Sequence, residues 1–210
     1  MSKVLLVTSS PRGDASHSTQ IARSLVDQLT SGDAQSTVVV RDLFKDPLPH
    51  IGEGFVTGRD TPPEQRTAAQ KIAIARSEEL IGELFAADVV VIASGMVNFG
   101  IPSTLKTYID HVVRAGITFR YTANGPEGLL KGKKAFLVHA SGGIYSQGPA
   151  QAANFQDTYL KHVLGFIGIT DVELITIEGI AYGPEAAQKA VAAASQRVSS
   201  VRPCPASAAA

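Results

Sequence analysis

The chain has 210 residues, 44% of them hydrophobic, which fits one globular domain with a substantial core. Its 19 basic and 19 acidic residues give a formal net charge of zero, and neither sign forms long blocks. This balance argues against a nucleic-acid partner, which requires a basic patch, and against an electron carrier that docks through an acidic face. No apolar run is long enough to span a bilayer or to form a signal peptide, so we expect a soluble, cytoplasmic protein.

Strand and helix signals alternate through the first part of the chain. Residues 3–7 are a short apolar strand, and the helix that follows places Ile21, Leu25 and Leu29 on one face. A second strand is predicted at residues 36–43.

Prolines and glycines mark the connection after this second strand. Residues 44–63 contain so many of them that we expect no regular structure there. Pro62 and Pro63 then fit the opening of a long helix that ends near Phe85.

The later part of the chain repeats the alternation. A strand at residues 88–94 leads to a helix that begins at Pro102, and residues 117–130 predict a short hairpin with its turn at Asn124-Gly125. The last elements are a strand at 133–140, a helix at 155–168, a strand at 171–178 and a helix at 184–198.

The alternation predicts an α/β fold with a doubly wound, five-stranded parallel sheet and helices on both faces. Right-handed crossovers leave few topologies, of which the order 2-1-3-4-5 is the commonest for five strands. Its ligand crevice opens at the carboxyl edge, between the first and third strands. No linker divides residues 1–201, which we expect to form a single domain.

The end of the chain, residues 202–210, is rich in proline and small residues, and we expect it to be disordered. It contains the single cysteine, Cys204. One cysteine forms neither an internal disulfide nor a multi-thiolate metal site, so no metal is predicted.

The loop after the first strand, residues 8–18, is rich in hydroxyl groups and leads into a helix N-terminus. Free N–H groups and the helix dipole favour an anion there. The loop has neither the Gly-Lys-Ser/Thr of a Walker A motif nor a Gly-x-Gly-x-x-Gly motif. Hydroxyls and backbone amides alone can hold a phosphate monoester, although the serines could equally serve only to cap the helix.

Two later loops lie at the same predicted edge. The stretch GMVNFGIP sets the amide of Asn98 between the apolar Met96 and Phe99, and Gly142-Gly143 allows a close approach of backbone to a flat ligand. Each loop alone could be an ordinary turn. The three together fit a phosphorylated flavin, whose ring is a broad apolar plate with a polar edge.

At these residues the chain resembles the bacterial FMN-dependent NADH-azoreductases and NAD(P)H-quinone reductases, a flavodoxin-like family. The most specific shared phrases are AGITFRYT-NGPEGL at residues 115–129 and GFIGITDV at residues 165–172. The Met-x-Asn-Phe loop, GGI---GP and EGIAYGPE also match. The resemblance covers essentially the whole chain, up to about Val201.

The resemblance implies a homodimer with one tightly bound FMN per subunit and both active sites at the interface. It implies that NADH or NADPH reduces FMN in a ping-pong mechanism and that two electrons per cycle then pass to a quinone or an aromatic azo compound. Two such cycles supply the four electrons that cleave an azo bond to amines. No catalytic acid or base is assigned, because hydride chemistry belongs to the cofactor. Carried over by position, the phosphate contacts are Ser10, Ser16, His17 and Ser18, and the ring contacts are Met96, Val97, Asn98, Phe99, Ala140, Ser141, Gly142 and Gly143.

Aromatic residues suggest a substrate pocket. Phe119, Tyr121 and Phe166 could line a wall for flat substrates, although aromatic residues also fill cores. The apolar segment ITFRYT also favours a dimer. His139 ends a predicted strand near the flavin site and could equally be structural.

The chain departs from the family pattern at three positions. Gly95 and Val97 stand where the family has a proline and an aromatic residue, and a smaller Val97 would widen the substrate cleft or shift the flavin potential. Ala140 replaces a frequent serine, so any contact there is through the backbone. A flavodoxin-type electron carrier without its own substrate and a non-flavin nucleotide-binding domain are the alternatives.

Overall fold

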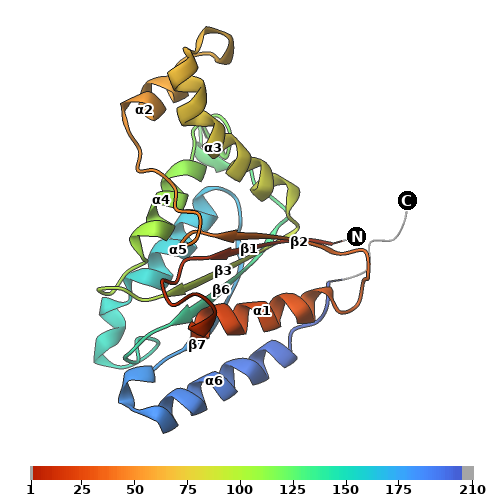
Figure 1. Ribbon diagram of the computed structural model, residues 1–210, viewed down its shortest axis with the longest axis vertical. Coiled ribbons are helices and arrows are strands. Elements are labelled where there is room, and N and C mark those ends of the chain that lie inside the picture. The colour runs from red at the N-terminus through yellow and green to blue at the C-terminus, as the bar shows by residue number, and fades with distance from the viewer. Residues whose placement is uncertain (1, 205–210) are drawn as a thin grey trace.

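A parallel five-stranded sheet forms the middle layer of the protein, with helices on both faces (Figure 1). The computed structural model describes residues 2–204. The strand order β2-β1-β3-β6-β7 confirms the predicted order 2-1-3-4-5. The sheet strands are β1 (Lys3–Thr8), β2 (Thr37–Asp42), β3 (Val89–Gly95), β6 (Lys134–Ala140) and β7 (Asp171–Ile177).

Alternating side chains of the strands fill two separate cores. Leu5 and Val7 of β1 lie in one core, under α3 (Ala68–Ala86), α4 (Ser103–Val112) and α5 (Phe155–Phe166). Val4 and Leu6 lie in the other core, under α1 (His17–Thr30) and α6 (Pro184–Ser199). Each such buried side chain stabilises the fold by roughly 1.5–3 kcal/mol. Within residues 2–204, no helix combines the length and the apolar character that crossing a membrane requires.

The carboxyl ends of β1, β3 and β6 reach the same edge of the sheet, at the left in Figure 1. Thr8 is paired with Ala93, and Gly95 is paired with Ala140. Just beyond the strands, the Met96 N–H donates to the Ala140 carbonyl at 2.8 Å. The register of the sheet therefore brings the three predicted loops together.

Residues Glu53–Asp60 form helix α2, so the prediction of an irregular segment at 44–63 is wrong there. Phe55 is buried and makes an edge-to-face contact with the His111 ring, 5.1 Å between centroids. Gly58 lies against α3, and a Cβ at this position would lie 3.0 Å from Ile74 Cγ1. The glycine thus permits close packing of α2 on α3, and this tertiary contact outweighs its low helix propensity.

The long helix α3 starts later than Pro62 and Pro63 predicted. Residues Pro63–Gln65 form a separate 3₁₀ turn, and α3 begins at Ala68. Thr67 and Gln70 form a capping box, in which each side chain accepts a hydrogen bond from the other residue's backbone N–H. This reciprocal cap satisfies two N–H groups and fixes the start of the helix.

The predicted hairpin is present as β4 (Phe119–Thr122) and β5 (Gly125–Gly128). Its turn is shifted by one residue, because Thr122 is paired with Gly125 and only Ala123 and Asn124 lie between the strands. Gly125, with a φ of 105°, supplies the left-handed conformation at the start of β5.

Residues 202–204, which belong to the segment predicted to be disordered, contact the end of α1. The Cys204 N–H donates to the Leu29 carbonyl at 3.0 Å, and Pro203 Cβ lies close to Gly32. The prediction for residues 205–210 lies outside the described residues.

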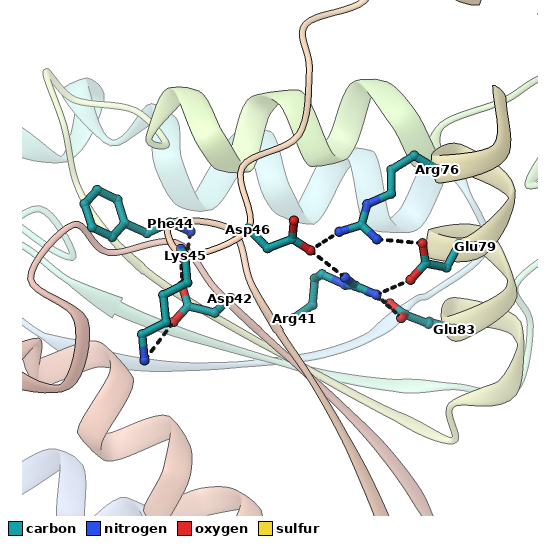
Figure 2. Close-up of polar contacts among 8 residues, drawn as sticks. All are labelled: Arg41, Asp42, Phe44, Lys45, Asp46, Arg76, Glu79 and Glu83. Atoms are coloured by element: carbon teal, nitrogen blue, oxygen red, sulfur yellow. Dashed lines mark hydrogen bonds and ion pairs between the residues drawn. The ribbon is translucent and has the colours of Figure 1, made fainter. Parts of the chain in front are cut away.

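An ion network joins the edge strand β2 to α3 (Figure 2). The Arg41 guanidinium contacts Glu83, Glu79 at 2.7 Å and Asp46 at 3.1 Å, and Arg76 also contacts Glu79 and Asp46. The hydrogen bond with Glu83 is the main cause that raises the pKa of Arg41 above its already high usual value. The network fixes an edge strand that pairs with β1 alone.

We expect Arg41→Ala to lower the free energy of unfolding by about 2 kcal/mol, because it leaves the Glu83 carboxylate without its main partner. The side chains of Arg41 and Glu83 are only 12% and 15% exposed. The matched control is Arg59→Ala, which breaks an exposed pair with Asp60 and should cost less than about 1 kcal/mol. Urea denaturation measures both, and equal effects would show that the network does not stabilise the edge.

Candidate functional site

The N-terminus of α1 offers free hydrogen-bond donors. Ser16 is the N-cap residue, but its side chain makes no capping bond and instead lies 3.1 Å from the Ser18 hydroxyl, Oγ to Oγ. The first helical hydrogen bond runs from the Gln20 N–H to the Ser16 carbonyl. The backbone N–H groups of the first turn, among them those of His17 and Ser18, therefore have no acceptor within the helix.

Buried hydroxyls surround this helix end. Ser10, Ser16 and Ser18 are buried, and His17 is half-buried. The next residue, Thr19, is also buried, and its Oγ1 has no hydrogen-bond partner among the described residues. We did not predict Thr19, although the hydroxyl run Ser16-His17-Ser18-Thr19 contains it. Unpaired N–H groups and hydroxyls at a positive helix end are the donor set that fits a phosphate.

The loop after β3 is a tight, strained turn. The Val97 and Gly100 N–H groups each donate to the other residue's carbonyl at 3.0 Å. The two residues between them have positive φ angles, 47° at Asn98 and 70° at Phe99. Asparagine tolerates this conformation, whereas for phenylalanine it costs on the order of 1–3 kcal/mol. Such strain is typical of functional sites, and here it leaves the Val97, Asn98 and Phe99 side chains exposed.

This turn is anchored on both sides without a proline. Met96 bonds to the Ala140 carbonyl as described, and the Phe155 N–H at the start of α5 donates to the Phe99 carbonyl at 3.1 Å. The Phe99 ring, half of its surface exposed, also meets Tyr145 edge to face, 6.2 Å between centroids. Glycine at position 95 therefore does not leave the turn unsupported.

The loop after β6 is held by its own hydrogen bonds. Ser141 donates its N–H to the Ile177 carbonyl at 3.0 Å and its hydroxyl to the Gly143 carbonyl at 2.8 Å. A Cβ on Gly143 would lie 3.1 Å from the Tyr145 ring, and a Cβ on Gly142 would lie 3.3 Å from Ala181 Cβ. Close contacts within the chain thus favour small residues here, independently of any ligand.

The three predicted substrate-pocket residues form a cluster of their own. Phe119 lies 5.5 Å from Tyr121 and 4.5 Å from Phe166, between ring centroids. Phe119 is buried and Phe166 half-buried, whereas Tyr121 is 74% exposed. Phe166 ends α5 and Phe155 begins it, which at 1.5 Å per residue separates them by roughly 16 Å. Within one chain, the aromatic cluster therefore lies a helix length away from the turn after β3, to which Phe155 is bonded.

A buried polar network lies under the loops after β3 and β6. His139 Nδ1 donates to the Asp157 carboxylate at 2.5 Å, and the Asn154 side-chain amide donates to the same carboxylate at 2.8 Å. Gln156 donates to the Ser94 hydroxyl at 2.7 Å. Burial acts to raise the pKa of Asp157, but the hydrogen bonds from His139 and Asn154 outweigh it, so this pKa is lowered overall. The sequence shows no sign of the pair, because its members are 18 residues apart.

These surfaces can hold two different chemical groups side by side. The end of α1 can bind an anion, and the exposed side chains of the Val97–Gly100 turn, with the loop after β6, can contact a flat apolar group with polar edges. The residues predicted as phosphate contacts and those predicted as ring contacts therefore lie at one edge of the sheet.

The family described as having a flavodoxin-like fold matches residues 2–201. The chain is 55% identical over 201 residues to a protein of Rhizobium johnstonii named FMN-dependent NADH:quinone oxidoreductase, covering 96% of this chain and 98% of the relative. It is similar to the crystal structure of an azoreductase from Bacillus anthracis str. Sterne, with a TM-score of 0.87, 33% identity, and 95% and 97% of the two chains covered. It is also similar to an FMN-dependent NADH-azoreductase from Bacillus anthracis str. Ames Ancestor in complex with FMN, with a TM-score of 0.85, 27% identity, and 95% and 98% covered.

Proposed function

This chain belongs to the family with the flavodoxin-like fold that matches residues 2–201, and from that premise we propose that it is an FMN-dependent NADH:quinone oxidoreductase that also reduces aromatic azo compounds. The observation that carries this proposal is the uncapped N-terminus of α1, with buried serine hydroxyls, at the same sheet edge as the strained Val97–Gly100 turn. A phosphate and a flat ring are the two parts of FMN.

The phosphate of FMN would be held by Ser10, Ser16, His17 and Ser18. Charge-assisted hydrogen bonds contribute roughly 1.5–3 kcal/mol each, so the first-turn N–H groups and two or three hydroxyls suffice without a lysine. The ring would be held by the loop from Met96 to Phe99 and by the loop from Ala140 to Gly143, largely through backbone at the second. FMN, when bound, accepts a hydride from NADH and passes two electrons on.

The protein's own contribution is to bind and orient. The exposed Val97 and Phe99 side chains present apolar surface for the ring or for a flat substrate, and valine leaves more room than an aromatic residue would. In the ping-pong order we propose, the nicotinamide leaves before the quinone or azo compound enters the same space. Parallel lines in double-reciprocal plots of initial rates would support this order, and intersecting lines would exclude it.

We expect Asn98→Gly to weaken FMN binding roughly tenfold, which corresponds to one or two lost hydrogen bonds to the ring edge. Glycine accepts the positive φ of this position, so the turn and the protein's stability should be retained. Flavin fluorescence titration gives the dissociation constant, and Cys204→Ala, far from the loops, is the control. Identical constants for both variants would remove Asn98 from the ring site.

A homodimer would complete the site. The aromatic cluster of Phe119, Tyr121 and Phe166 lies away from the loops of its own chain, yet it exposes Tyr121, and Phe155 beside the Val97–Gly100 turn is also exposed. Exposed aromatic side chains of this kind are typical of interfaces. A partner's hairpin could bring its aromatic cluster to the flavin as a substrate wall. Sedimentation equilibrium giving only the monomer mass at micromolar concentration would contradict this arrangement.

The direct test of the activity uses purified protein loaded with FMN. NADH should be oxidised rapidly when a benzoquinone or an azo dye is added and slowly without either. Protein that cannot be loaded with FMN, or that binds FMN but never accepts electrons from NADH, would refute the proposal. A cytoplasmic location remains a prediction.

A further inference from the structure

His139 is a buried histidine with one ring nitrogen in use and one free. Its Nδ1 bonds to Asp157, while its Nε2 is buried and has no hydrogen-bond partner among the described residues. Its backbone lies between Val138 and Ala140 at the end of β6. A buried polar atom without a partner is costly, which suggests that this nitrogen has a role beyond tying β6 to α5.

The free nitrogen belongs to a residue that lines a cavity of about 10 Å³ under the proposed flavin loops. Met96 and Ser141, one from each ring-contacting loop, line the same cavity. The neighbouring Thr176 of β7, together with Asn154 and Gln156, adds uncharged polar groups. His139 therefore lines the same cavity as a residue from each of the two loops that would hold the ring.

Acidic groups face His139 from two directions. Asp157 on α5 bonds to Nδ1, and Glu178, just after β7, lines the cavity while accepting the Tyr145 N–H at 2.7 Å. A cation also acts on the pair, because the charge of Lys161 lowers the pKa of Asp157. Proton uptake by His139 thus changes the charge of a cluster that holds the buried Asp157 and the half-buried Glu178.

We propose that His139 is a positioning residue that couples the flavin to pH: Asp157 holds its ring, and protonation at Nε2 places a positive charge beneath the two loops that contact the flavin. This inference rests on the proposed function. The neutral ring presents an acceptor at Nε2, and the protonated ring presents a donor. No covalent bond changes; the imidazole takes up one proton from solvent and returns it.

A positive charge favours the more negative redox state of the flavin, which is the reduced one. Reduction should therefore be more favourable at low pH by an amount that depends on His139. By linkage, reduction of the flavin must in turn favour protonation of His139. A purely structural His139–Asp157 pair would change FMN affinity or stability and leave the pH dependence of the midpoint potential as it is.

The test is the midpoint potential of the FMN-loaded protein, measured by spectroelectrochemistry from about pH 5 to about pH 8, the range in which histidine titrates. Wild type is compared with His139→Gln, with Asp157→Asn, and with His162→Gln as a control, since His162 is an exposed histidine on α5. From about pH 8 to about pH 5, we expect the midpoint potential of wild type to rise by ~20 mV more than that of His139→Gln. For two electrons, this corresponds to about a fivefold gain in the affinity of the protein for reduced over oxidised FMN. His162→Gln should match wild type.

A His139→Gln protein with the wild-type pH profile overturns the inference and leaves the proposed function standing, whereas a wild type that binds no FMN overturns the proposed function itself. If His139→Gln does not fold, the NMR titration of His139 in wild type decides. Its midpoint must move to higher pH when the flavin is reduced, and an unchanged midpoint excludes the coupling. If His139→Gln changed the dissociation constants for oxidised and reduced FMN equally at each pH, the role of His139 would be merely structural.

Discussion

Ser16→Asp should raise the dissociation constant for FMN at least about 100-fold while the protein remains folded. Ser16 is the N-cap of α1, and aspartate is as good an N-cap residue as serine. Its negative charge also complements the positive end of the helix dipole, so thermal stability should be unchanged or higher. The same charge occupies the place proposed for the phosphate and repels it. Fluorescence titration and a thermal melt measure the two effects separately.

Riboflavin provides the matched control ligand, because it has the flavin ring without the phosphate. Wild type should bind FMN much more tightly than riboflavin, and Ser16→Asp should remove most of that difference while it changes riboflavin binding little. If the variant weakened both ligands equally, the phosphate could not lie at the end of α1.

Gly128→Ala should have the largest effect on stability, a loss of more than about 3 kcal/mol or failure to fold. A Cβ at Gly128 would lie 2.1 Å from the backbone N of Gly168 and 2.3 Å from the carbonyl carbon of Ile167. These are backbone atoms and cannot rotate away. Next to them, the Leu130 N–H donates to the Ile167 carbonyl at 2.9 Å, so the hairpin would be pushed from the end of α5.

The control for this substitution is Gly82→Ala in the exposed part of α3. A Cβ there meets nothing within 4 Å, and alanine in a helix is more stable than glycine by roughly 0.5–1 kcal/mol. Guanidinium denaturation should therefore show opposite signs for the two variants. A Gly128→Ala protein as stable as wild type would mean that the hairpin does not pack on the chain in this way.

The sheet could be predicted because its signals are local. Each strand contains a short apolar run, and the rules for parallel sheets and right-handed crossovers then fix the strand order. The Ser16–Ser18 cluster and the Met96–Phe99 loop were found in the same way, from residue types beside a strand end.

What could not be predicted depends on contacts between distant residues. Helix α2 forms because Phe55 and Gly58 pack on other helices. The glycines of this segment argue against a helix when only the local sequence is considered. The positive φ of Phe99 contradicts the preference of its residue type and is maintained by the hydrogen bonds around it. Likewise, no local sequence pattern indicates that the aromatic cluster of Phe119, Tyr121 and Phe166 lies a helix length from the turn after β3.

A crystal structure of the protein with FMN would show directly where the phosphate and the ring bind. We expect the phosphate within hydrogen-bond distance of the Ser16 and Ser18 hydroxyls and the first-turn N–H groups of α1, with the ring between the Met96–Phe99 and Ala140–Gly143 loops. A phosphate bound elsewhere, or a ring that leaves these two loops untouched, would contradict this expectation.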